Sequence, residues 1–157
     1  MSLLAVSHYR QRQQADCLAA CAAMVLEYFH LPFTYERLLR LLNIRYYGAA
    51  FSSLRKLESL GVAATIARGD LTSLQGHLED GSPVIVAINT TPLPYWDDDT
   101  AHAVVVVGFE QDRILVNDPG FDQAPQAIPR NAFLLGWLEQ DYRYAVLRPA
   151  SAAKKGI

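Results

Sequence analysis

The apolar residues of the chain change their spacing near its middle. Up to about residue 80 they lie mostly in segments rich in Ala, Leu, Met and Glu, which are strong helix formers. After residue 80 they lie in runs of Val, Ile and Ala, whose β-branched members favour strands. These patterns predict helices at residues 17–29, 35–42, 54–60 and about 71–78, and strands at residues 63–67, 83–88, 103–109, 114–117 and 144–147.

Two parts of this pattern define the expected architecture. The helix predicted at 17–29, with Asp16 as its N-cap, carries apolar residues on more than one face and should therefore be buried. The strands at 103–109 and 114–117 are separated by four polar residues, a length that suits a hairpin. Because helices precede an antiparallel sheet and no glycine-rich phosphate-binding loop is present, we expect an α+β fold rather than repeated βαβ units.

The composition fits one compact domain. The 157 residues are 51% hydrophobic and 19% charged, which predicts a single domain at residues 1–149 and a disordered tail at residues 150–157. The net charge is -2 and Lys and Arg are scattered, so neither nucleic acid nor an anionic membrane is an expected partner. The most apolar stretches are too short to span a membrane and no signal peptide is recognisable, so a cytoplasmic location is expected.

The two cysteines have different expected roles. Cys17 lies in the first turn of the predicted helix, where free backbone N–H groups and the positive end of the helix dipole favour a thiolate. Cys17 is therefore a candidate nucleophile, with a small packing residue as the alternative. Cys21, one turn deeper among alanines, is expected to pack in the core. No second Cys or His pair at ligand spacing accompanies them, so neither a metal nor a cofactor is expected.

His102 is the histidine whose surroundings best suit a catalytic base. It lies between the acidic residues 97–99 and the apolar strand at 103–109, at the mouth of the predicted sheet. Asp118 ends the other strand of the hairpin, so the two side chains can be neighbours and the carboxylate can orient the imidazole. The alternatives are a core histidine and a turn formed by Asp-Pro-Gly.

A side-chain amide ahead of the helix completes the candidate site. Gln11 precedes Cys17 by six residues, and an amide in this loop can donate a hydrogen bond beside the helix N-terminus. Such a donor stabilises the oxyanion that forms when a thiolate attacks a carbonyl group. Gln13 and Gln14 compete for the same role.

Together these segments resemble the bacteriocin-processing peptidase family, whose members remove double-glycine leader peptides. The matching segments are residues 11–21, 101–106 and 117–119. The resemblance implies a papain-like fold, in which the cysteine helix packs on the antiparallel sheet that carries the histidine and the aspartate. It also implies four roles: Cys17 as nucleophile, His102 as base, Asp118 as the residue that orients the base, and Gln11 as oxyanion donor.

Two features depart from the family pattern. Leu18 stands where the family usually has a glycine after the cysteine, and its larger side chain is expected to narrow the cleft or to alter the oxyanion pocket. Most members precede an export ATPase, whereas this sequence contains no Walker motif and resembles a stand-alone member. The resemblance implies a peptide substrate such as a leader peptide, and it makes a separate export transporter a candidate partner.

The expected activity is that of a thiol endopeptidase that cleaves after a double-glycine-type leader. Two other functions are compatible with the sequence: a peptide-binding module without turnover, and a papain-like transglutaminase or amidase. Retention of all four residues argues against the binding module. The aromatic residues at 95–96 and 46–47 are candidate walls of a substrate cleft, with core packing as the alternative.

Overall fold

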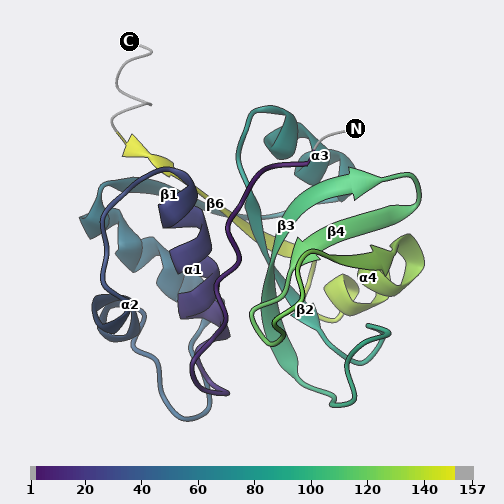
Figure 1. Cartoon of the computed structure of the whole chain (residues 1–157), viewed down its shortest axis with the longest axis horizontal. Coiled ribbons are helices and arrows are strands. Elements are labelled where there is room, and N and C mark those ends of the chain that lie inside the picture. The colour runs from purple at the N-terminus through teal and green to yellow at the C-terminus, as the bar shows by residue number, and fades with distance from the viewer. Residues whose placement is uncertain (1–2, 151–157) are drawn as a thin grey trace.

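A six-stranded antiparallel sheet forms the centre of the structure, a computed structural model that describes residues 3–150. The strands are β1 (Val62–Arg68), β2 (Val84–Asn89), β3 (Ala101–Glu110), β4 (Arg113–Asn117), β5 (Gln126–Pro129) and β6 (Arg143–Pro149). They follow the order β1-β6-β2-β3-β4-β5, and every neighbouring pair is antiparallel. The last strand therefore joins β1 to the other four (Figure 1).

Helices cover both faces of this sheet. The first face packs against α1 (Cys17–Tyr28), α2 (Tyr35–Leu41) and the 3-10 helix η1 (Phe51–Leu60). The second face packs against α3 (Leu71–Glu79) and α4 (Arg130–Leu138). Successive side chains along each strand alternate between the two faces. In β2, Ile85 and Ala87 point toward α1, while Val86 and Ile88 point toward the opposite face. The predicted α+β class is confirmed.

Helix α1 is central because its sequence is apolar on every side. All side chains from residue 18 to residue 26 are buried, and four of these nine residues are alanines. Small side chains let the helix axis approach β3, against which α1 packs. The position of the sheet therefore fixes the position of the first turn of α1, which carries Cys17.

Three features differ from the sequence prediction. The third helix is a 3-10 helix, and both β5 and α4 were not predicted. Strand β5 has only four residues at the sheet edge and ends in Pro129, while α4 has no side-chain cap and contains Gly136, so both lack the usual signals. Asp16 occupies the predicted N-cap position of α1, but its side chain makes no capping hydrogen bond. Its carboxylate instead accepts hydrogen bonds from the backbone of residues 12 and 13 and from the Tyr35 hydroxyl.

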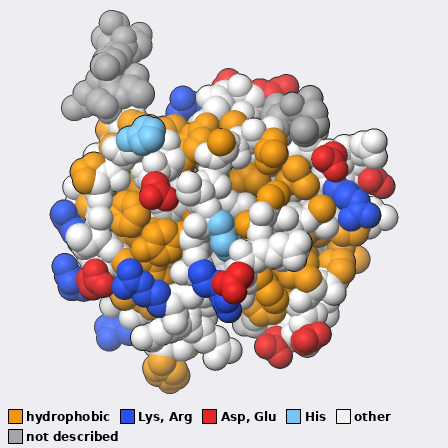
Figure 2. Space-filling view, viewed as in Figure 1, with side chains coloured by type: hydrophobic (Ala, Val, Ile, Leu, Met, Phe, Trp, Pro, Cys, Tyr) orange, Lys and Arg blue, Asp and Glu red, His pale blue; other side chains and the backbone are white. Residues whose placement is uncertain are grey.

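The surface and the chain ends add two observations. On the face shown in Figure 2, positive and negative side chains are interspersed and neither sign forms a continuous surface. No helix within residues 3–150 is long and apolar enough to cross a membrane. Of the predicted tail, Ala150 donates a backbone hydrogen bond to Gly61, and the other residues lie outside the described part of the chain.

Two glycines, one in each of the nine-residue helices α3 and α4, allow a test of how these helices pack on the second face of the sheet. An added Cβ at Gly136 of α4 would lie 2.5 Å from the Asn89 carbonyl oxygen, whereas one at Gly76 of α3 would meet nothing within 4 Å. Gly136→Ala should lower the free energy of unfolding by about 1–3 kcal/mol through overpacking. Gly76→Ala should raise it by about 1 kcal/mol through helix propensity. Urea denaturation measures both changes, and a stabilised Gly136→Ala variant would contradict the close contact of α4 with β2.

Candidate active site

The candidate catalytic residues lie where the first turn of α1 meets the edge of the β3–β4 hairpin. Cys17 is the first residue of α1, His102 is the second residue of β3 and Asp118 directly follows β4. Val105 pairs with Asn117 in the β3–β4 ladder, which places His102 and Asp118 on one face of the hairpin, two positions apart in register. The hairpin therefore brings the imidazole and the carboxylate together, as the sequence predicts.

Asp118 is a buried carboxylate whose two oxygens each accept two hydrogen bonds. Oδ1 lies 2.7 Å from His102 Nε2 and accepts from the Gly120 backbone N–H at 2.9 Å. Oδ2 accepts from the Tyr95 hydroxyl at 2.9 Å and from Trp96 Nε1 at 2.8 Å. The exposed fractions of the His102 and Asp118 side chains are 4% and 0%. A buried charge is costly unless it is paired and hydrogen-bonded, and this one is both.

These contacts set the protonation states of the pair. Burial lowers the pKa of His102, but the hydrogen bonds of its ring with Asp118 and Cys17 outweigh burial and raise the pKa from 6.5 to about 9. Burial raises the pKa of the Asp118 carboxyl, but the hydrogen bond and charge of His102 outweigh it and the pKa falls below its ordinary value. Burial and the charge of Asp118 raise the pKa of Tyr95, so its hydroxyl stays protonated and donates. An ion pair of imidazolium and carboxylate is therefore the state at neutral pH.

Trp96 covers the His102–Asp118 pair as well as bonding to it. Its ring meets the imidazole edge to face, with centroids 4.8 Å apart. An added Cβ at Gly120 would lie 3.0 Å from the Trp96 ring, so the absence of a side chain there permits the approach. The sequence assigned Tyr95 and Trp96 only as cleft walls. The available signal was that both aromatic residues carry a polar donor and lie in the loop that leads to His102.

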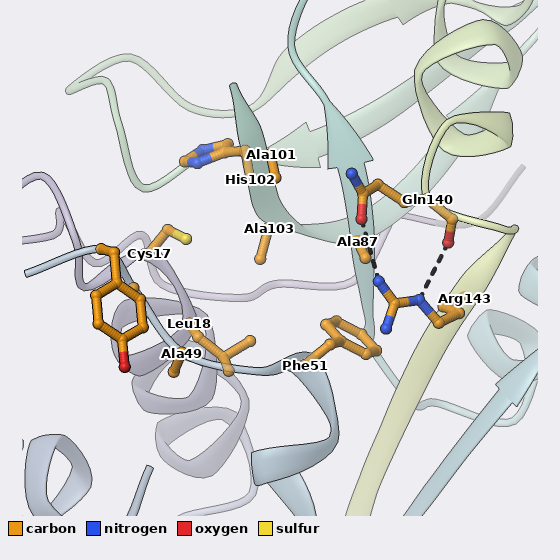
Figure 3. A pocket seen from close by; sticks show the side chains of 12 residues that line it. Cys17, Leu18, Ala49, Phe51, Ala87, Ala101, His102, Ala103, Gln140 and Arg143 are labelled. Carbon is orange, nitrogen blue, oxygen red and sulfur yellow. Dashed lines mark hydrogen bonds between the residues drawn. The ribbon is translucent and has the colours of Figure 1, made fainter. Parts of the chain in front are cut away.

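Cys17 and Cys21 differ as their positions in the helix predict. Cys17 is partly exposed and Cys21 is fully buried. Since Nε2 of His102 faces Asp118, the other ring nitrogen is the one left for the Cys17 side chain, whose hydrogen bond helps to raise the histidine pKa. The Cys17 sulfur and the imidazole lie side by side at one end of a cavity (Figure 3). Burial and then the nearby Cys17 raise the pKa of Cys21, which keeps it a thiol.

Gln11 reaches the same region, but its amide is occupied in this structure. Its Nε2 donates to the backbone oxygens of Gln13 and Gln14 at 2.9 and 3.0 Å, and its Oε1 is buried without a partner. The backbone N–H of Gln11 donates to the Pro119 oxygen at 2.9 Å, which ties the loop ahead of Cys17 to the segment that follows Asp118. Gln11 and Gln14 both line the cavity that contains Cys17 and His102, whereas Gln13 does not.

Two cavities flank Cys17 and His102. The larger, of about 600 Å³, is bordered by Gln11, Trp96, Asp98 and Asp99, among other residues. The smaller, of about 140 Å³, has walls formed by Leu18, Tyr47, Gly48, Ala49, Phe51, Ala87, Ala101, Ala103, Gln140 and Arg143. Leu18 is only 4% exposed and belongs to the core cluster, so it forms a wall of the smaller cavity rather than a plug in the cleft. Across residues 3–150, no three His, Cys, Asp or Glu side chains are grouped to hold a metal ion.

An exposed aromatic pair borders both cavities. Tyr46 and Tyr47 are 94% and 74% exposed, with their rings in edge-to-face contact. They form the tip of a tight turn in which the backbones of Arg45 and Gly48 bond to each other, and Gly48 has the positive φ of 102° that this turn requires. Tyr47 borders both cavities and Tyr46 borders the larger one, so the structure places this pair at the cleft as the sequence suggests.

This arrangement agrees with a comparison against known families. The sequence model described as the peptidase C39 family matches residues 5–141. The chain belongs to this family. The C39 membership confirms the predicted family and the predicted cysteine peptidase. A comparison with curated protein sequences gives no match.

Solved structures of C39 peptidases share the fold of this chain. The double-glycine-motif protease of an AMS/PCAT transporter, in complex with the leader peptide, has 21% identity, a TM-score of 0.75 and 94% coverage of both chains. A C39-like peptidase from Bacillus anthracis has 18% identity, a TM-score of 0.78, and coverage of 94% of this chain and 97% of that one. The peptidase domain of Streptococcus ComA, a bifunctional ABC transporter, has 19% identity, a TM-score of 0.73, and coverage of 94% and 98%. The papain-like fold is thereby confirmed.

Replacing Asp118 tests the origin of the high histidine pKa. Asp118→Asn removes the negative charge beside Nε2, so the pKa of His102 should fall from about 9 to well below that value. Because the folded pKa lies above the ordinary 6.5, the pair stabilises the fold at pH below about 6.5 and loses this effect as the pH rises through about 9. NMR titration of the imidazole, assigned with a His102→Gln variant, measures the shift. An unchanged His102 pKa in Asp118→Asn would show that the carboxylate does not hold the proton.

Proposed function

We propose that this C39 peptidase cleaves peptide bonds with Cys17 as nucleophile, His102 as general base and acid, and Asp118 as the residue that orients His102. The observation that carries the proposal is the buried contact of 2.7 Å between His102 Nε2 and Asp118, which leaves the other ring nitrogen for Cys17. A histidine with a pKa of about 9 is protonated at neutral pH and can accompany a thiolate.

In the steps that we propose, Cys17 reacts as a thiolate beside the His102 imidazolium. The Cys17 thiolate attacks the substrate carbonyl carbon, a sulfur–carbon bond forms and the carbonyl oxygen becomes an oxyanion. The carbon–nitrogen bond then breaks, the leaving amine takes a proton from the His102 imidazolium, and an acyl-enzyme remains. Water attacks this thioester while the neutral imidazole accepts its proton. The carbon–sulfur bond then breaks, the carboxylic acid product leaves, and Cys17 returns as a thiolate beside the imidazolium.

The start of α1 supplies donors for the oxyanion. The carboxylate of Asp16 turns toward the loop ahead of the helix and does not cap it, so it does not occupy the N–H groups of the first turn. These N–H groups and the helix dipole favour a negative charge at this point. We assign Gln11 as the additional side-chain donor, which requires its amide to leave the carbonyls of Gln13 or Gln14 when substrate binds.

The substrate class comes from the family and from its relatives. We propose that the substrate is a leader peptide with small residues, such as Gly-Gly, before the cleaved bond. In support, the AMS/PCAT protease, which shares the fold, is described as a double-glycine-motif protease bound to a leader peptide. We further propose that residues 1–149 act as a single peptidase domain in the cytoplasm and serve a separate export transporter.

Peptide cleavage and cysteine labelling test the proposal together. Synthetic leader peptides that end in Gly-Gly, Gly-Ala or Gly-Ser, each followed by cargo residues, should be cut after the small pair by the wild type. Cys17→Ala should cut none of them, because no other described residue provides a thiolate at this site. Iodoacetamide at neutral pH should label Cys17 much faster than the buried Cys21. Mass spectrometry reads both results, and cleavage by Cys17→Ala, or equal labelling rates, would exclude Cys17 as the nucleophile.

The role of Gln11 is tested separately by kinetics. Gln11→Ala should lower kcat by about 10²–10³, the usual loss when one oxyanion donor is removed, while KM and Cys17 labelling change little. Gln13→Ala is the matched control, since its side chain does not line the cavity. Gln14→Ala tests the competing assignment, because Gln14 does line it. A larger loss in Gln14→Ala than in Gln11→Ala would transfer the role to Gln14.

A further inference from the structure

The smaller cavity ends at a positive charge. Cys17 and His102 lie at one end of this space of about 140 Å³, and the guanidinium of Arg143 lies at the opposite end (Figure 3). Most of the wall between them is small and apolar, with Ala49, Ala87 and Ala103 among its residues. A substrate group that passes Cys17 and His102 into this cavity therefore meets one further charged side chain, and that side chain is positive.

Arg143 has no acidic partner among residues 3–150. Its Nε and Nη2 donate to the backbone oxygen and to Oε1 of Gln140 at 3.2 and 3.1 Å, and its guanidinium carbon lies 5.5 Å from the centroid of the Phe51 ring. Within residues 3–150, no carboxylate lies within 4.0 Å of Arg143, and its Nη1 has no hydrogen-bond partner. A half-buried guanidinium fixed by neutral partners retains the capacity to bind an anion.

The backbone holds Arg143 in this position. Asp141 and Tyr142, directly before it, both have positive φ values of 58° and 54°, which non-glycine residues rarely adopt. Trp137 maintains this turn: its backbone oxygen accepts from the Tyr142 N–H at 3.0 Å, and its indole N–H donates to the Arg143 oxygen at 2.9 Å. The guanidinium is thus preorganised, which lowers the entropic cost of binding a ligand.

The charged side chains that border the larger cavity also favour binding of a carboxylate in the smaller one. Asp98 and Asp99 border the larger cavity, and neither of them borders the smaller one. A carboxylate of a bound peptide is repelled there and attracted to Arg143, so the two cavities distinguish the two directions along a substrate.

We propose that the smaller cavity binds a carboxylate of the peptide substrate through Nη1 of Arg143, and that this selects peptides with such a group close to the cleaved bond. The proposal rests on the assignment of Cys17 as the reactive cysteine in the proposed function. The carboxylate belongs either to an Asp or Glu side chain or to the C-terminus of a short peptide. Both sources offer Arg143 the same chemistry.

Cysteine alkylation tests this recognition without requiring turnover. Three bromoacetyl reagents differ only in their charge: bromoacetyl-Glu amide carries a side-chain carboxylate, bromoacetyl-Gln acid carries a terminal one, and bromoacetyl-Gln amide carries none. The rate of Cys17 alkylation by each is measured on the full chain by intact mass. We compare the alkylation rate of each charged reagent with that of the neutral one as a ratio. The intrinsic reactivity of the thiol cancels in this ratio. A preference for the Glu reagent identifies an acidic side chain as the ligand, and a preference for the Gln acid identifies a peptide C-terminus.

Variants of two arginines in β6 provide the comparison. For at least one charged reagent, the ratio of its alkylation rate to that of the neutral reagent should be about tenfold higher in wild type than in Arg143→Gln. A factor of about ten is what the loss of one charge-assisted hydrogen bond produces. Arg143→Lys should keep part of this preference. Arg148→Gln, which removes the same charge from an exposed position of the same strand, should behave as wild type. An unchanged rate for the neutral reagent in Arg148→Gln shows that the loss of a charge from β6 does not by itself disturb the site.

The outcomes separate this proposal from the proposed function. Equal ratios in wild type and Arg143→Gln, or an equal fall in Arg148→Gln, would overturn carboxylate recognition even if leader peptides are cleaved. A tenfold preference that depends on Arg143 supports it even if no leader peptide is cleaved.

Discussion

The buried ion pair of His102 and Asp118 is the interaction on which the site depends. Removing two charges from water is unfavourable unless each gains hydrogen-bond partners. Asp118 has four such partners, and they come from β3, from the aromatic loop before β3 and from the turn after β4. Those three segments must therefore meet at one point. This requirement accounts for the glycine at position 120, because a side chain there would displace the Trp96 ring that completes the set.

Two aspartates lie near Cys17, and their hydrogen-bond partners differ. Asp118 faces the imidazole and stabilises its positive charge. Asp16 is adjacent to Cys17 in sequence, and its charge would oppose a thiolate if it capped the helix. Its carboxylate instead bonds to the Tyr35 hydroxyl at 2.7 Å and to backbone N–H groups of the preceding loop. The Asp16 carboxylate therefore does not occupy the N–H groups in the first turn of α1.

Sequence reasoning succeeded where function depends on local pattern and failed where it depends on distant contacts. The apolar run after Cys17 and the hairpin that joins His102 to Asp118 were readable because their spacing is short and periodic. The donors Tyr95 and Trp96 were not, since each lies more than twenty residues from the carboxylate it bonds. Arg143 was missed for the same reason, because only the fold brings the start of β6 to the cleft.

In the function that we propose, catalysis and substrate choice depend on different parts of the structure. The His102–Asp118 pair is buried and saturated with hydrogen bonds, so a change at any partner leaves an unpaired polar group. The cleft beyond it is bordered by side chains with fewer contacts, such as the exposed Tyr46 and Tyr47, and Arg143, whose Nη1 has no partner among residues 3–150. We expect substitutions there to alter substrate binding while the buried pair keeps its hydrogen bonds. The solved structures compared with this chain share its fold at 18–21% identity, so the fold tolerates substitution at most positions.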